Sequence, residues 1–176
     1  MNDEPINTQD FFPKLTDANT KVALVFAEGT CTYAELDRRI KQFASGLLGD
    51  NADLSEQRIA FIMPANLDYV TTLLGIWRAG GIAVPLNVSA AIPELEDALT
   101  CAGVSHLIAD TEHQQKLRGL CASIDIHMSV VDDVLQEESG QLPTIVDGRR
   151  AMILFTSGTT KKPKGVISTH KNIRSQ

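Results

Sequence analysis

The sequence predicts an α/β fold, a mainly parallel sheet flanked by helices. Two observations carry this prediction. Strand-like and helix-like segments alternate along the chain, and the strand segments are continuous apolar runs, which is typical of strands buried on both faces. The chain has 176 residues, 43% of them hydrophobic and 22% charged, which favours one globular unit over a disordered chain.

The first elements are a hairpin and a helix. Residues 21–26 and 31–33 are β-rich and flank Glu28-Gly29, which predicts the hairpin. Thr32 is then placed to cap a helix with Glu35 three residues later, and Gly49 is placed to end it. The apolar positions at helical spacing are Leu36, Ile40, Phe43, Ala44, Leu47 and Leu48.

The middle of the chain repeats the strand–helix order. Apolar runs predict strands at 58–63, 82–86, 106–109 and 126–131. Asn66 is expected to cap the helix that ends at Gly80. A second helix is expected from Pro93 to Gly103, and Thr111 is expected to cap a third.

The last third contains a linker and two further strands. The acidic and then Gly/Pro-containing residues 132–143 indicate a surface connection. Residues 151–155 predict a strand, 166–168 a shorter one, and a new element begins near His170. Since a domain rarely stops where an element begins, we expect the chain to be truncated. Residues 1–20 form an N-terminal segment, and 21–176 form the α/β unit.

Composition excludes several functional classes. The net charge of −6 gives no general basic footprint for nucleic acid. Cys31, Cys101 and Cys121 are too widely spaced for a zinc or disulfide framework, which favours reduced thiols. The polar, acidic N-terminus is no signal peptide, and no apolar run reaches the roughly 20 residues that a membrane span needs. We therefore expect a cytoplasmic protein.

The segment most informative about chemistry is TSGTTKKPKG at 156–165, directly after the strand at 151–155. Gly158 permits close approach of the backbone, and consecutive N–H groups in such a turn bind anions. The candidate phosphate-binding residues are Thr156, Ser157, Gly158, Thr159, Thr160, Lys164 and Gly165. Four hydroxyls and a lysine predict a phosphate site, although a Ser/Thr-rich surface turn shares the hydroxyl pattern.

A Walker-type loop does not fit this spacing. Counting from Gly158, position 163 is proline where that loop needs glycine, and position 165 is glycine where it needs the hydroxyl residue for magnesium.

The segment instead resembles the phosphate loop of the AMP-forming acyl-activating superfamily, which includes acyl-CoA synthetases. TYAEL at 32–36 and WRAGGIAVPL at 77–86 resemble two further motifs of that family, in the expected order. Lys161 stands where the family usually has glycine. Residues 166–174 are weakly similar to malonyl-CoA and other short- or medium-chain acyl-CoA synthetases.

The resemblance implies the incomplete N-terminal part of the large domain of a carboxylic acid–CoA ligase. Such an enzyme uses ATP, Mg²⁺ and coenzyme A to form an acyl-adenylate and then an acyl-thioester. The later family motifs, which supply the magnesium carboxylate and the catalytic lysine, are not in this chain, so we expect no catalytic residue here. We also expect that this chain alone is inactive and that it self-associates. A stand-alone, non-catalytic nucleotide- or phosphate-binding module is the alternative.

Other conspicuous residues have structural interpretations. Helical spacing with Val70 and Leu74 predicts that Trp77 is a core residue. His106 is expected to be structural, and His170 to begin a helix. His113 and His127 have no partner at metal-binding spacing. The acidic residues of the connection are expected to be solvated; they are Asp132, Asp133, Glu137 and Glu138.

Overall fold

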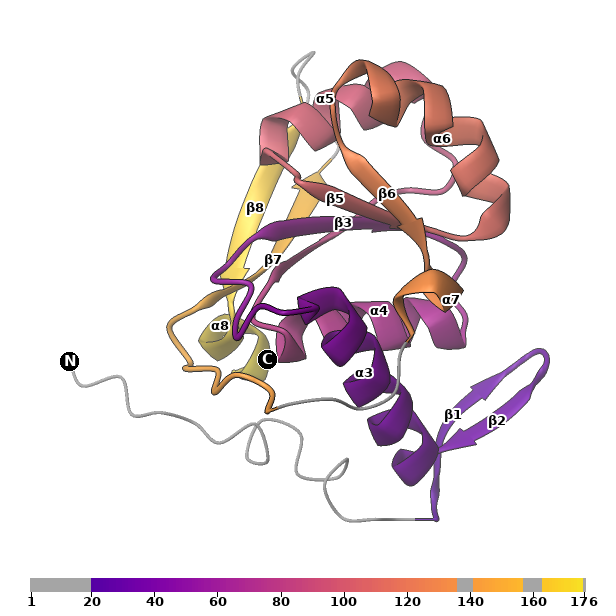
Figure 1. Cartoon of the computed structure of the whole chain (residues 1–176), viewed down its shortest axis with the longest axis vertical. Helices are drawn as coiled ribbons and strands as arrows, with labels where there is room; N and C mark the ends of the chain where they lie inside the picture. Colours follow the sequence, from indigo (N-terminus) through magenta and orange to yellow (C-terminus); the bar gives the residue numbers. More distant parts are fainter. Residues whose placement is uncertain (1–19, 136–140, 157–162, 176) are drawn as a thin grey trace.

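The computed structural model describes residues 20–135, 141–156 and 163–175. They form a two-stranded hairpin and a six-stranded sheet in the order β6-β5-β3-β4-β7-β8, with helices on both faces (Figure 1). The strands are β1 (Val22–Phe26), β2 (Gly29–Thr32), β3 (Arg58–Ile62), β4 (Ile82–Pro85), β5 (His106–Ala109), β6 (His127–Val130), β7 (Arg150–Thr156) and β8 (Lys164–Thr169). The helices are α3 (Tyr33–Leu48), α4 (Leu67–Arg78), α5 (Ile92–Ala102), α6 (Thr111–Ser123), α7 (Val131–Val134) and α8 (His170–Arg174).

The sheet is parallel except at one edge. β6, β5, β3, β4 and β7 run in the same direction, and β8 pairs antiparallel with β7. The predicted mainly parallel α/β fold is therefore confirmed. The sequence did not predict the antiparallel edge, which places β7 and β8 in one hairpin.

Two layers of helices bury the two faces of the sheet. α5 and α6 pack on one face, where Leu99 and Leu117 lie in one core with Ile62 and Val84. α3, α4 and α7 pack on the other face, where Phe43 joins a second core. Figure 1 shows these layers above and below the strands, with the β1–β2 hairpin projecting beside α3. Burial on both faces explains why the strand segments are continuous apolar runs.

The helix ends follow local capping chemistry. The Thr32–Glu35 capping box of α3 is present, and Asn66 caps α4. Gly103 ends α5 in the left-handed conformation (φ 61°). The expected cap of α6 was wrong by one residue. Asp110 caps it, because its carboxylate accepts a hydrogen bond from the backbone N–H of His113, and Thr111 is the first helical residue.

The predicted surface connection contains a short helix. Residues Val131–Val134 form α7, in which Val131 and Val134 are buried against the α3 side of the sheet. Asp132 and Asp133 between them are exposed, as expected for solvated residues, whereas Glu137 and Glu138 lie outside the described residues. Among the helices that the structure describes, none has the length and apolar character to cross a membrane.

Candidate functional site

The candidate loop leaves and re-enters the sheet at a single point. β7 ends at Thr156 and β8 begins at Lys164, and these two residues are directly opposite each other in the antiparallel register. Opposed residues share one face of a sheet, with Cβ atoms about 4.5–5.5 Å apart. Both residues are exposed. The hairpin therefore presents a hydroxyl and an ammonium side by side at the carboxyl edge of the parallel strands, the edge at which open α/β sheets bind ligands.

Of the seven predicted phosphate-binding residues, the structure places three: Thr156, Lys164 and Gly165. Ser157, Gly158, Thr159 and Thr160, together with Lys161, lie outside the described residues. The described residues thus define the two positions, at the end of β7 and the start of β8, to which the rest of the loop is attached.

Gly165 allows close packing between the two strands of the hairpin. A Cβ atom at this position would lie 2.9 Å from Ile153 Cγ2 and 3.4 Å from Phe155 Cε1. The first distance is too short for a real contact, so a side chain here would force the Ile153 side chain of β7 to move. Gly165 therefore contributes by leaving space for β7 rather than by touching a ligand through a side chain.

The base of the loop also borders a pocket on the α5 face of the sheet. Its volume is ≈ 230 Å³, and Arg58, Cys101, Phe155, Gly165 and Ile167 are among its lining residues. The Cys101 thiol at the end of α5 donates to the Pro163 carbonyl at 3.9 Å. This contact links α5 to the residue just before β8.

The opposite end of β7 is held by a buried aromatic pair. Trp77 of α4 donates its indole N–H to the Ala151 carbonyl at 2.7 Å. The His170 ring packs edge-on against Trp77 with 5.7 Å between centroids, and the backbone N–H of His170 donates to the Arg149 carbonyl at 3.0 Å. Burial, and to a smaller extent Arg149, lowers the pKa of His170 to about 4. The predicted roles of Trp77 as a core residue and His170 as a helix start are confirmed.

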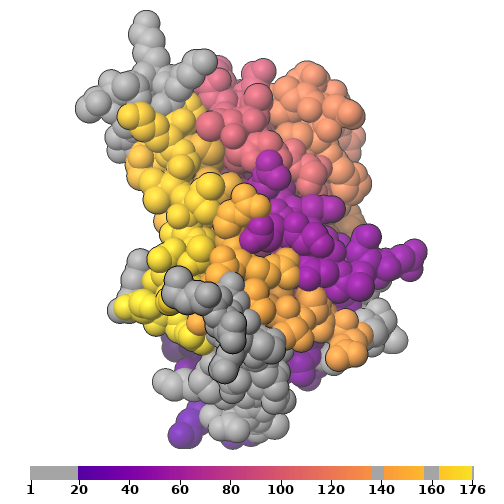
Figure 2. Space-filling model, turned by 90° about the vertical axis from the view of Figure 1, so that its left-hand side faces the viewer, coloured from indigo at the N-terminus to yellow at the C-terminus, as the bar shows by residue number. Residues whose placement is uncertain are grey.

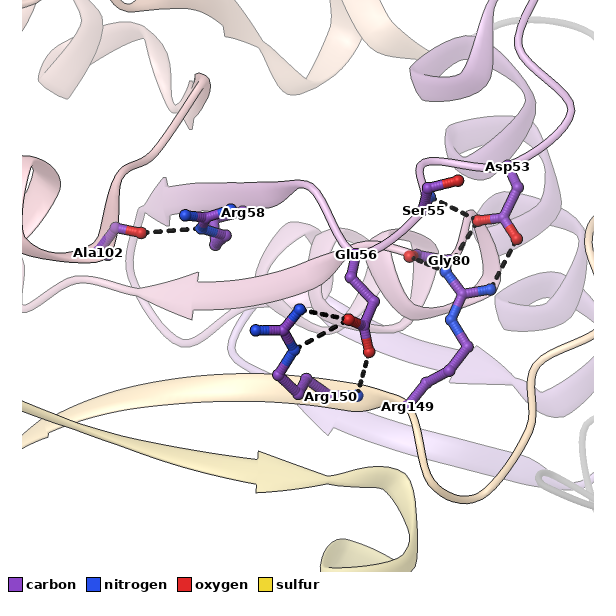
Figure 3. A network of polar contacts seen from close by, with 8 residues as sticks. All are labelled: Asp53, Ser55, Glu56, Arg58, Gly80, Ala102, Arg149 and Arg150. Atoms are coloured by element: carbon purple, nitrogen blue, oxygen red, sulfur yellow. Dashed lines mark hydrogen bonds and ion pairs between the residues drawn. The ribbon is translucent and has the colours of Figure 1, made fainter. Parts of the chain in front are cut away.

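Arg149, just before β7, forms ion-pair and hydrogen-bond contacts with two earlier segments. Its guanidinium binds both carboxylate oxygens of Asp53, at 2.6 and 2.9 Å, and donates to the Gly80 carbonyl at 2.6 Å (Figure 3). The Arg149 hydrogen bonds hold the pKa of Asp53 below its ordinary value. Gly80 has φ +81°, and a Cβ there would lie 2.1 Å from Asp53 Oδ1. Gly80 therefore follows the end of α4, as predicted, and its lack of a side chain leaves room for this ion pair.

Arg150 and Arg58 make further polar contacts at the amino edge of the sheet (Figure 3). The Arg150 guanidinium contacts Glu56 at 2.5 and 2.9 Å and thereby lowers the Glu56 pKa. Arg58 donates to the Ala102 carbonyl at 3.0 Å, at the end of α5. No sequence pattern indicated these residues. The partners of Arg149 and Arg150 lie 96 and 94 positions away, so no local pattern marks the pairs.

Within the described ranges, no group of three or more His, Cys, Asp or Glu side chains is arranged to hold a metal ion. The described part of the site is thus a hairpin with a cationic and hydroxyl tip. Its chemistry suits anion binding by charge and hydrogen bonding.

Comparison with known proteins identifies relatives that are named as CoA synthases or CoA ligases. The feruloyl-CoA synthase of Amycolatopsis sp. is 35% identical over 143 residues, covering 81% of this chain and 29% of that protein. The human mitochondrial malonate–CoA ligase ACSF3 is 33% identical over 165 residues, covering 88% of this chain and 29% of that protein. The chain therefore spans 29% of the length of these relatives.

Solved structures share the fold. Apo MatB from Rhodopseudomonas palustris superimposes with a TM-score of 0.82 and 24% identity, over 97% of this chain and 36% of that one. The N-terminal subdomain of Klebsiella oxytoca NpsA, in complex with 3-hydroxybenzoyl-AMSN, superimposes with a TM-score of 0.78 and 25% identity. The match covers 94% of this chain and 41% of that one. The family model described as AMP-binding enzyme matches residues 13–176. The chain therefore belongs to the AMP-binding enzyme family.

Proposed function

We propose that this chain is part of an ATP-dependent, AMP-forming carboxylic acid–CoA ligase, and that residues 156–165 hold the ATP phosphates. The observation that carries the proposal is the register of the hairpin, in which Thr156 and Lys164 are opposed at the tip. The segment between them has the composition of an anion-binding turn. Membership in the AMP-binding enzyme family supports the same assignment.

The proposed reaction has two steps. A substrate carboxylate oxygen attacks the α-phosphorus of ATP, the bond to the bridging oxygen breaks, and pyrophosphate leaves with that electron pair. The coenzyme A thiol, after losing its proton, then attacks the acyl carbon, and AMP leaves. In the first step two anions approach each other and negative charge grows on the leaving group. Positioned donors at 156–160 and the Lys164 ammonium would stabilise that charge.

The chain's described residues suit this phosphate role better than a metal role. They include no group of three or more His, Cys, Asp or Glu side chains placed to hold a metal ion, so we assign none of them to Mg²⁺, which commonly binds through substrate phosphates. Relatives named for feruloyl-CoA and malonate–CoA chemistry support a carboxylic acid as the acyl substrate.

Three further predictions belong to the same proposal. The first is that residues 1–20 form an N-terminal segment and that residues 21–176 form the N-terminal α/β subdomain. The second is that the protein is cytoplasmic. The third is self-association, which is supported by exposed apolar side chains on the β7–β8 hairpin. Leu154, Val166 and Ile167 are 42%, 52% and 53% exposed, and Figure 2 views the β8 side of the molecule, where β8 (yellow) lies at the surface.

The discriminating experiment is ATP–pyrophosphate exchange by the protein that contains this chain, screened against carboxylic acids that include ferulate and malonate. Exchange that depends on one acid is the expected result. ATP binding without exchange for any acid would favour the non-catalytic nucleotide-binding module. A protein that binds no ATP at all would contradict both assignments.

A further inference from the structure

A pair of histidines lies on a part of the sheet that the proposed ligase chemistry does not use. His106 begins β5 and His127 begins β6, and the parallel register places them opposite each other. β3 and β4 separate β5 from β7 in the strand order. Both histidines also lie at the amino edge of the parallel strands, whereas the candidate loop lies at the carboxyl edge. The pair is therefore distinct from the candidate phosphate site.

The two imidazoles converge on one oxygen atom. His106 Nε2 lies 2.9 Å from Ser129 Oγ, and His127 Nε2 lies 3.1 Å from the same Oγ. The ring centroids are 4.5 Å apart. A serine hydroxyl has a single proton, so at least one of the two imidazoles donates its N–H to the oxygen. Two nitrogens thus point at one position roughly 3 Å from each, an arrangement that sequence spacing did not indicate.

The surroundings leave the position between the two rings open from one side. His127 is exposed on the edge strand of the sheet, while His106 and Ser129 are half-buried. Water and dissolved ions can therefore reach the position between the rings.

We propose that His106 and His127 form a binding site for a divalent transition-metal ion such as Zn²⁺, with both Nε2 atoms as ligands. Ser129 turns to another staggered rotamer, and the ion takes the position near its oxygen. Each histidine adopts the tautomer with the proton on Nδ1. Zn–N bonds are about 2.0–2.1 Å, so each ring moves inward by roughly 1 Å.

The chemistry of the two ligands selects the class of ion. Imidazole nitrogen suits Zn²⁺, Ni²⁺ and Cu²⁺, whereas Mg²⁺ requires oxygen ligands. Water completes the coordination. The bound ion joins β5 to the edge strand β6, so it stabilises the folded chain by an amount that grows with the logarithm of the free ion concentration once this exceeds the Kd.

The test is zinc titration by calorimetry of tag-free protein near neutral pH. All variants carry Cys101→Ser, because Cys101 is a free, exposed cysteine and cysteine thiolates also bind zinc. The parent, which carries only Cys101→Ser, is expected to bind one Zn²⁺ per chain, and Mg²⁺ should give no binding heat. His127→Ala, a change at an exposed position, should weaken binding by at least about tenfold, since loss of even a supporting group costs that much. Ser129→Ala is the matched control and should bind Zn²⁺ at least as tightly as the parent, because it keeps both imidazoles.

Two further readouts locate the ion. Zinc should raise the Tm of the parent but not that of His127→Ala. It should also shift the imidazole NMR signals of His106 and His127 and leave those of the buried His113 and His170 unchanged. The proposal is overturned if the parent shows no saturable zinc binding, if His127→Ala binds zinc as well as the parent, or if Ser129→Ala loses binding. None of these outcomes depends on ligase activity.

Discussion

The two ends of β7 are built differently. The amino end is fixed by side chains from distant segments, since Trp77 donates to Ala151 and Arg149 binds Asp53 and the Gly80 carbonyl. At the carboxyl end, exposed Thr156 and Lys164 are paired through the backbone of the hairpin. The two ends of the strand therefore have different roles. Buried contacts position the strand, and exposed groups at the other end remain available to a ligand.

The largest expected effect comes from removing the aromatic contact at the amino end. Trp77→Ala deletes a side chain that is 6% exposed and should lower the free energy of unfolding by about 3–5 kcal/mol. Chemical denaturation measures this change. Trp77→Phe keeps an aromatic ring against His170 but loses the N–H donor to Ala151, so it should cost less. If Trp77→Ala lowers the free energy of unfolding no more than Lys164→Ala does, the two ends of β7 do not differ in the way described.

Two adjacent arginines provide the next test. Arg149→Met leaves the Asp53 carboxylate and the Gly80 carbonyl without their shared donor, which should cost about 1–3 kcal/mol of unfolding free energy. Arg150→Met is the matched control, because the Arg150 side chain is 49% exposed against 17% for Arg149. Its effect should be smaller and should shrink further in high salt. Equal losses for the two variants would show that burial does not distinguish them.

The pH dependence of stability tests the buried His170 at the amino end of β7. Folded His170 has a pKa of about 4, below the ordinary value near 6.5. Between these values the unfolded chain binds the proton and the folded chain does not, so stability should fall as the pH decreases from about 6.5 toward 4. His106 acts in the same direction, so the contribution of His170 is the difference between the wild type and His170→Phe. If the free energies of unfolding of these two proteins depend on pH in the same way, the predicted contribution of His170 is wrong.

Sequence patterns predicted the elements whose signals are local. The α3 capping box, Asn66 at α4 and Gly103 at α5 are each encoded within a few residues. The misplaced cap of α6 shows the limit of such patterns. Asp110 and Thr111 are both good caps, and only the observed contact from Asp110 to His113 distinguishes them.

Long-range features were not predictable in the same way. The antiparallel direction of β8 is set by its pairing with β7, which no local sequence pattern indicates. The expected strand at 166–168 proved to lie within Lys164–Thr169. The Arg149–Asp53 pair and the convergence of His106 and His127 are products of tertiary structure and strand register. The motif at 156–165 predicted a phosphate site, and the structure adds the register that opposes Thr156 and Lys164.

The most direct test of phosphate binding at the carboxyl end of β7 compares two lysines of the candidate loop. It uses steady-state adenylation kinetics, with ATP varied, in the protein that contains this chain. Lys164→Ala should lose a charge-assisted hydrogen bond to phosphate, about 1.5–3 kcal/mol, or roughly ten- to hundredfold in rate or ATP affinity. Its unfolding free energy should change little, because Lys164 is exposed. Lys161→Gly, which introduces the usual family residue, should leave adenylation nearly unchanged or improve it. A larger loss of activity in Lys161→Gly than in Lys164→Ala would contradict the assignment of Lys164 as the phosphate-binding lysine.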